Sequence, residues 1–229
     1  MGSKALKAAF PHTIPIMAGF LFLGMTYGVT MQVKGFPFYY PMLTSLMIYA
    51  GSMEFVTSNL LLGVFDPLQA FLMTLMVNAR HLFYGLALLD RFPGKGLQRA
   101  YMIFGLTDET FSISCAVEPP PDVDKSQFQF FVTFLNQCYW VTGATLGGLT
   151  GMLLKFNTQG LDFAMTAMFV VIFIEQWKKD KNHAPALTGL LISVVCLILW
   201  GPDGFVIPAM GGIILALTLL RKPLEGGIA

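Results

Sequence analysis

Ionisable side chains stand inside or at the ends of long apolar stretches of this sequence. They are Glu54, Arg80, Asp108, Glu109 and Asp162. A charged group in an apolar environment is costly unless it is paired, neutralised by a change of protonation or hydrated. These residue types can bind a polar ligand, carry protons or pair with one another. Each of these roles requires that the fold bring distant stretches of the chain together.

The stretch Asn78-Ala79-Arg80-His81 places three polar side chains in the middle of an apolar segment. Asn78 and His81 are three residues apart, so they share one face of a helix, and Arg80 lies one step to the side. Together they supply an amide, a cation and a titratable imidazole. A lone histidine in such a segment usually forms only a hydrogen bond, but this combination favours a functional role.

Two adjacent carboxylates occur in the stretch Thr107-Asp108-Glu109-Thr110. Neighbouring side chains on a helix point about 100° apart, so at most one of the two faces a given partner squarely. A carboxyl group in a low-dielectric setting can change its protonation near neutral pH and couple proton movement to substrate movement. The alternative is a structural ion pair with Arg80, and the two roles are compatible.

The composition indicates which elements position these residues. Of the 229 residues, 55% are apolar and only 12% are charged, whereas a soluble domain normally has about 25% charged residues. Residues 8–33, 35–53, 126–154 and 184–202 contain no Asp, Glu, Lys or Arg. About 20 residues of helix span the hydrocarbon core of a bilayer, and helices satisfy their own backbone groups there. The sequence therefore predicts an all-α, polytopic membrane bundle.

We expect a single membrane domain over residues 1–229, with six to eight transmembrane or re-entrant helical segments. Charge, Pro and Gly separate apolar segments at about 13–33, 41–64, 67–89, 100–116, 127–154, 161–177, 184–200 and 205–220. If segments 41–64 and 161–177 do not cross the membrane fully, most Lys and Arg lie on the cytoplasmic side, as the positive-inside rule requires.

That topology gives residues 1–116 and 127–229 opposite orientations. Inverted halves are typical of secondary transporters, whose broken helices meet near the middle of the bilayer and form the substrate site. Both proposed broken segments carry a polar cluster that begins with glycine, at Gly51 and at Gly160. We therefore hypothesise an inverted repeat with its site between the two breaks.

A stripe of small residues runs along segment 127–154. Gly143, Gly147 and Gly151 are spaced by four residues, and Asn136 and Trp140 continue the stripe. Small residues at this spacing let two helix backbones approach closely. We interpret the stripe as a packing surface for another helix.

The same sequence argues against several functional classes. A net charge of +1 without clustered Lys and Arg excludes a nucleic-acid binder. The three cysteines and three histidines are far apart, so they predict no metal site, and the chain has no phosphate-binding or dinucleotide motif. We expect no cofactor and no enzyme activity. A small-solute channel and a non-catalytic subunit of a membrane complex stay open as alternatives to a transporter.

Several stretches resemble the signature segments of the AzlC-like branched-chain amino-acid permease family. They occur in the family's order over nearly the whole chain, and Asn-Ala-Arg-His-Leu is the most specific: residues 49–55, 77–85, 106–111, 139–143 and 160–165. Relatives often have Gln in the Gly-x-x-Gln-Phe motif, where this sequence has Glu54. This departure bears on substrate preference or on coupling.

The resemblance implies a multi-pass protein of the cytoplasmic membrane that exports branched-chain and related apolar amino acids, driven by the proton gradient. It also implies a small hydrophobic partner subunit of the AzlD type. A zwitterionic substrate needs a cation or helix N-terminus for its carboxylate and an anion for its ammonium. Arg80, with Asn78 or the helix end near Gly51, suits the carboxylate, and Glu54 or Asp108 suits the ammonium.

The candidate substrate-binding residues are therefore Gly51, Glu54, Asn78, Arg80, Asp108 and Asp162, and the candidates for proton coupling are His81, Asp108 and Glu109. We expect Glu54, Arg80 and Asp108 to converge on one hydrated pocket halfway through the bilayer.

Overall fold

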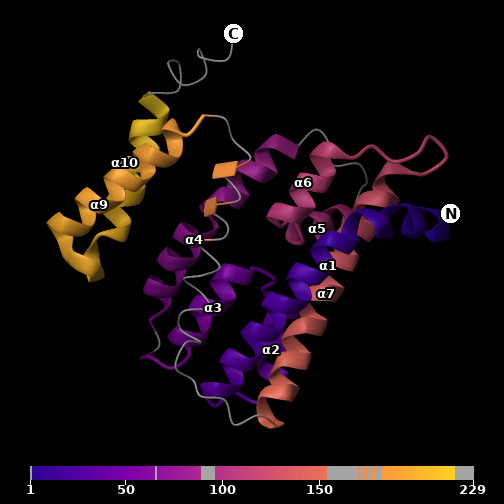
Figure 1. Ribbon diagram of the computed structural model, residues 1–229, viewed down its shortest axis with the longest axis horizontal. Helices are drawn as coiled ribbons and strands as arrows, with labels where there is room; N and C mark the ends of the chain where they lie inside the picture. Colours follow the sequence, from indigo (N-terminus) through magenta and orange to yellow (C-terminus); the bar gives the residue numbers. More distant parts are fainter. Residues whose placement is uncertain are drawn as a thin grey trace. The chain divides into compact units, whose positions relative to one another are not determined.

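The computed structural model describes residues 2–64, 66–88, 96–153 and 182–219, together with the single positions 170, 173, 174, 177 and 178. Across these residues the regular secondary structure consists of α-helices, which confirms the all-α prediction (Figure 1). The chain divides into two compact units, Met1–Ala164 and Met165–Ala229. The inverted repeat of residues 1–116 and 127–229 stays a prediction.

Two long helices, α1 (Gly2–Val33) and α7 (Lys125–Leu153), run side by side in the first unit (Figure 1). Their contact uses the predicted glycine stripe. A Cβ atom on Gly147 would overlap the carbonyl oxygen of Met25, and one on Gly28 would overlap that of Ala144. The two backbones therefore touch directly, which confirms the packing role of the stripe.

Segment 41–64 is broken, as the topology argument predicted. Its two parts are α2 (Tyr39–Met47) and α3 (Gly51–Leu60). Between them, Tyr49 has a φ of 47° and Ala50 has a φ of −135° and ψ of 64°, so neither continues the helix. We call residues 48–50 the first break. The corresponding break proposed near Gly160 lies outside the described residues.

Segment 100–116 is also broken, which the sequence analysis did not predict. It forms α5 (Gly96–Phe104) and α6 (Asp108–Ala116), and we call residues 105–107 the second break. Thr107 caps α6, because its Oγ1 accepts a hydrogen bond from the Thr110 backbone N–H at 3.3 Å. Our continuous segment was wrong because apolarity alone does not reveal a helix start inside an apolar run.

The helix α4 (Pro67–Leu88) matches predicted segment 67–89 closely. It begins with a strong start signal: the Asp66 carboxylate accepts hydrogen bonds from the backbone N–H groups of Leu68 and Gln69, each at 3.0 Å. Pro67 stands at the first helical position, where its missing N–H costs nothing. This helix carries the Asn-Ala-Arg-His stretch.

The second unit contains a helical pair, α9 (Ala184–Gly204) and α10 (Val206–Leu219), at the predicted segments 184–200 and 205–220. Gly201 has a φ of 71°, a left-handed conformation that suits glycine and kinks the end of α9. Within the described residues, α1 and Ala184–Gly201 are long and apolar enough to cross a membrane by length and composition. Large apolar side chains along α9 are exposed, as contact with lipid requires.

Candidate functional site

A buried polar stripe on α7 positions the parts of this site. It consists of Thr133, Asn136, Gln137 and Trp140, which recur at helical spacing and are all buried. Polar side chains in an apolar helix need partners, because an unsatisfied polar group is costly there. The partners of this stripe lie at the two helix breaks.

Trp140 links the stripe to the first break through Glu54. Its Nε1 donates hydrogen bonds to both carboxylate oxygens of Glu54, at 3.0 and 3.2 Å. The Ala50 backbone N–H donates to the same carboxylate at 3.1 Å. Glu54 is 0% exposed and lies in the first turn of α3. Its carboxylate therefore satisfies one end of the break and fixes α3 against α7.

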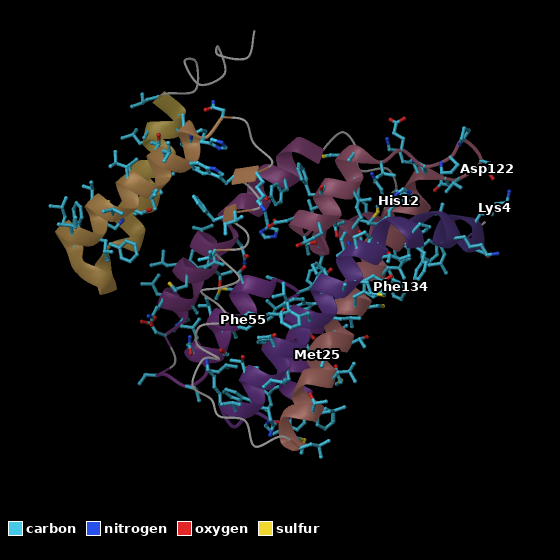
Figure 2. All side chains as sticks on the ribbon, viewed as in Figure 1. Lys4, His12, Met25, Phe55, Asp122 and Phe134 are labelled. Atoms are coloured by element: carbon cyan, nitrogen blue, oxygen red, sulfur yellow. The ribbon has the colours of Figure 1, made fainter. Side chains whose placement is uncertain are left out.

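Aromatic packing encloses this contact. The Trp140 ring stacks near Tyr27 of α1, with 6.5 Å between ring centroids, and a Cβ on Gly51 would lie 3.3 Å from the Trp140 ring. Phe55 of α3, labelled in Figure 2, packs edge-on against Tyr27 at 5.3 Å. The start of α3 is therefore held between α1 and α7 in a largely apolar setting.

Gln137 connects the first break to the helix that precedes the second. Its Nε2 donates to the Leu46 carbonyl oxygen at 3.0 Å, near the end of α2. Its Oε1 accepts from the Tyr101 hydroxyl of α5 at 2.6 Å. The last carbonyls of a helix lack intrahelical partners, so this amide satisfies one of them and joins α2 to α5.

Asn136 and Thr133 contact the second break. The Asn136 Nδ2 donates to the Thr110 Oγ1 at 3.1 Å, in the first turn of α6. Gly105 lies so close to Thr133 that a Cβ at this position would overlap the threonine methyl group. One face of α7 thus holds both breaks.

Tyr49 belongs to the first break, and its ring lies near Gly105 of the second. It is the single non-glycine residue with a positive φ in the described part of the chain, and this conformation costs about 1–2 kcal/mol. Its side chain is 4% exposed, and its ring is 6.4 Å from that of Phe104. Its hydroxyl oxygen is buried and has no hydrogen-bond partner in the structure.

The residues predicted on α4 lie near α6. His81 is half-buried, and its Nδ1 lies 3.3 Å from the Asn78 carbonyl oxygen. The His81 ring is 5.7 Å from Tyr84, whose ring stacks on Phe111 of α6 at 4.5 Å. The structure therefore connects the Asn-Ala-Arg-His helix with the helix that carries Asp108 and Glu109.

The predicted site residues are described to different extents. Glu54 is fully buried, Asp108 and Glu109 are half-buried in the first turn of α6, and each of the two makes interactions. The side chain of Arg80 and the whole of Asp162 lie outside the described residues. The convergence of Glu54, Arg80 and Asp108, and the alternative ion pair between Arg80 and Asp108, therefore stay predictions.

Sequence reasoning missed Tyr49, Thr110 and Gln137 as parts of this site, and it gave Asn136 and Trp140 only a packing role. A signal was present in part, because the polar residues at 133, 136, 137 and 140 share one helical face. What they contact could not be read from that spacing.

This arrangement suits a small ligand with separated charges. The first backbone N–H groups of a helix have no intrahelical acceptor and carry partial positive charge, so the starts of α3 and α6 favour an anionic group. The carboxylates in the same first turns favour a cationic group. Among the described residues, no cluster of His, Cys, Asp and Glu is of a kind that holds a metal ion.

The family model for the AzlC protein matches residues 15–154, a range that contains both breaks and the polar stripe. The chain belongs to the AzlC family. This assignment agrees with the resemblance seen in the sequence motifs. The buried contacts described above, from Glu54 to Trp140, therefore lie in the part of the chain that defines the family.

Relatives of this AzlC-family chain include membrane and transport proteins. The branched-chain amino acid transport protein AzlC of Bacillus subtilis is 59% identical over 96% of this chain and 87% of its own length. An uncharacterised membrane protein of Haemophilus influenzae is 45% identical over 97% of this chain and 92% of its own. The inner membrane protein YgaZ of Escherichia coli is 26% identical over 84% of this chain and 82% of its own. No solved structure matches the chain.

Proposed function

We propose that this protein is a secondary-active transporter that exports branched-chain and related apolar amino acids across the cytoplasmic membrane, coupled to the proton gradient. One observation carries the proposal: two interrupted helices are held by the same buried polar face of α7. Interrupted helices at membrane depth are the usual source of substrate and ion sites in such transporters. The Bacillus relative, which is named a branched-chain amino acid transport protein, supports the substrate class.

A carrier fits the burial of these groups better than a pore does. A pore needs weak, multiple and hydrated sites along its length. Here Glu54 is 0% exposed, so a ligand reaches the first turn of α3 only if the surrounding helices move. Such movement is the basis of alternating access.

We assign the substrate to the region between the two breaks and α4. In this proposal, the substrate-binding residues are Gly51, Glu54, Asn78, Arg80, Asp108 and Asp162, and the proton-coupling residues are His81, Asp108 and Glu109. The start of α3 and the Arg80 guanidinium attract the substrate carboxylate, and the acidic groups attract its ammonium. A small membrane subunit of the AzlD type completes the transporter in the cell.

The inverted repeat is part of the same proposal. It places the loops near Arg91 and Lys179 on the same, cytoplasmic side of the membrane. Single cysteines at these two positions should react with an impermeant reagent from that side only. Reaction from opposite sides would refute the proposed topology.

The test of function is efflux from proteoliposomes that contain the purified chain, with and without its small partner. Vesicles are loaded with radiolabelled leucine, isoleucine, valine, alanine or lysine, and efflux is followed with and without a pH gradient. We expect saturable efflux of the branched-chain substrates and faster efflux when protons can enter against the leaving substrate. Flux that does not saturate would indicate a channel, and absence of leucine flux in both preparations would refute the proposal.

A further inference from the structure

Two buried oxygen atoms beside the breaks lack hydrogen-bond partners in the structure. They are the hydroxyl oxygen of Tyr49 and the side-chain oxygen of Asn136. Tyr49 is 4% exposed and Asn136 is 0% exposed, so water does not satisfy them at the protein surface. Buried polar atoms are nearly always hydrogen-bonded, and an exception needs an explanation.

Both side chains contact the second break or the helix that follows it, Tyr49 from the first break and Asn136 from α7. Tyr49 packs near Gly105, where an added Cβ would lie 3.7 Å from the tyrosine ring. Asn136 is fixed there because its Nδ2 donates to Thr110. Glu54 and Glu109 stand in the first turns of α3 and α6, the helices that follow the two breaks.

The buried side-chain atoms of this region that have no hydrogen-bond partner are oxygens. The side-chain nitrogens of Asn136, Gln137 and Trp140 already donate to Thr110, Leu46 and Glu54, respectively. The atoms without any partner are the carbonyl oxygen of Asn136, which can only accept, and the hydroxyl of Tyr49, which can accept or donate. Acceptors near two helix starts that carry acidic residues in their first turns suit a ligand that carries hydrogen-bond donors and a positive charge.

We propose that the Tyr49 hydroxyl and the Asn136 side-chain oxygen bind the ammonium group of the amino-acid substrate, between the first turns of α3 and α6. The assignment rests on the proposed transport of amino acids. A primary ammonium has three N–H donors, which match these two oxygens and one neighbouring carboxylate. It also explains why a tyrosine occupies a left-handed position that glycine or asparagine would adopt at lower cost.

The test compares leucine with two analogues that each lack one of its charged groups. Leucinol has the ammonium without the carboxylate, and 4-methylpentanoate has the carboxylate without the ammonium. Each competes with radiolabelled leucine for the purified protein, as wild type and as Tyr49→Phe. This substitution removes the hydroxyl and keeps the ring, and the loss of an unpartnered group leaves the unliganded fold intact.

In Tyr49→Phe we expect leucine and leucinol to bind about 10- to 150-fold more weakly, as for the loss of a hydrogen bond to a charged group. The affinity for 4-methylpentanoate should not change. A loss confined to leucine and 4-methylpentanoate would place the carboxylate here and overturn the proposal. An equal loss for all three ligands, or no loss, would overturn it as well.

Gln129→Leu is the matched control. Gln129 is also on α7, and its side-chain oxygen is also buried and has no hydrogen-bond partner. It precedes Asn136 by seven residues, about 10 Å along the helix, and its removal should leave all three affinities unchanged. Asn136→Ala should weaken leucine and leucinol selectively.

Two further measurements keep the outcome decisive. In the wild type, 4-methylpentanoate should bind more weakly than leucinol, and the reverse order would overturn the proposal without any variant. Replacement of sodium by choline should not change the leucine affinity. If the wild type needs sodium and Tyr49→Phe loses that need, the site binds a sodium ion and the proposal is wrong. Absence of leucine binding in the wild type would instead refute the proposed function.

Discussion

The hydrogen bond from Trp140 to Glu54 offers a direct test of how the first break is held. Trp140→Phe removes the Nε1 donor that contacts both carboxylate oxygens, at 3.0 and 3.2 Å, and keeps an aromatic ring in place. Glu54 then retains only one of the two donors described here, the Ala50 N–H. At a pH where the Glu54 carboxyl is ionised, a hydrogen bond to this charged group contributes about 1.5–3 kcal/mol. We therefore expect the free energy of unfolding to fall by that amount.

Thermal unfolding of the purified protein in detergent measures this loss. For a chain of this size, 1 kcal/mol corresponds to about 2–4 °C in Tm, so Trp140→Phe should lower Tm by about 3–12 °C. Phe134→Leu is the control on the same helix, because Phe134 is 44% exposed (labelled in Figure 2) and should change Tm little. A Tm for Trp140→Phe that equals the wild-type value would refute the structural role of this contact.

A double-mutant cycle with Glu54→Gln isolates the contribution of the charge. The amide oxygen that this substitution introduces still accepts from Trp140, but a hydrogen bond between neutral groups contributes only about 0.5–1.5 kcal/mol. Trp140→Phe should therefore cost about 1 kcal/mol less in the Glu54→Gln background than in the wild type. Equal losses in the two backgrounds would contradict a charge-assisted bond.

Three other substitutions, one of them with a matched control, test separate parts of the structure. Gly147→Ala should lower the free energy of unfolding by about 1–3 kcal/mol or more, because its Cβ overlaps the backbone of α1. Gly19→Ala has open space around it, and the same thermal assay should find it no less stable than the wild type. Gln137→Leu should cost about 2–4 kcal/mol, because a carbonyl and a hydroxyl lose their partners together; a change below about 1 kcal/mol would show that it does not join the two helices. Arg80→Ala should abolish leucine flux in proteoliposomes while expression stays intact, and retained flux would remove Arg80 from the site.

Features that depend on local composition and residue spacing could be predicted from the sequence. The all-α class followed from long uncharged runs, and a close helix contact at α7 followed from glycines spaced by four residues, although the spacing did not identify α1 as the partner. The first break was expected beside Gly51, because positive-inside counting left no room for a full crossing there. The second break was missed although Thr107, Asp108 and Glu109 form an ordinary helix start. The same side chains that suit proton coupling also suit a helix N-terminus, so their residue types alone do not distinguish the two roles.

The site could be predicted only in part, because its contacts join residues far apart in the chain. Glu54 was selected correctly as a buried polar residue, but its partner Trp140 is 86 positions away. Gln137 and Leu46 are 91 positions apart. Local spacing does not specify such pairs, since they depend on how the half-helices pack against α7. Tyr49 lies in the signature stretch 49–55, but its role was not predicted, because its significance comes from its backbone conformation.

The direct backbone contact between α1 and α7 has a mechanical consequence. Helices that interlock without intervening side chains cannot rotate or slide unless they first separate. In the proposed transport cycle, this pair is the stationary frame, and the half-helices that pack against it through aromatic and polar side chains are the parts that shift. In that cycle, opening of the buried region exchanges polar contacts between the half-helices and α7. The amide and indole groups of α7 then determine which positions the half-helices can occupy.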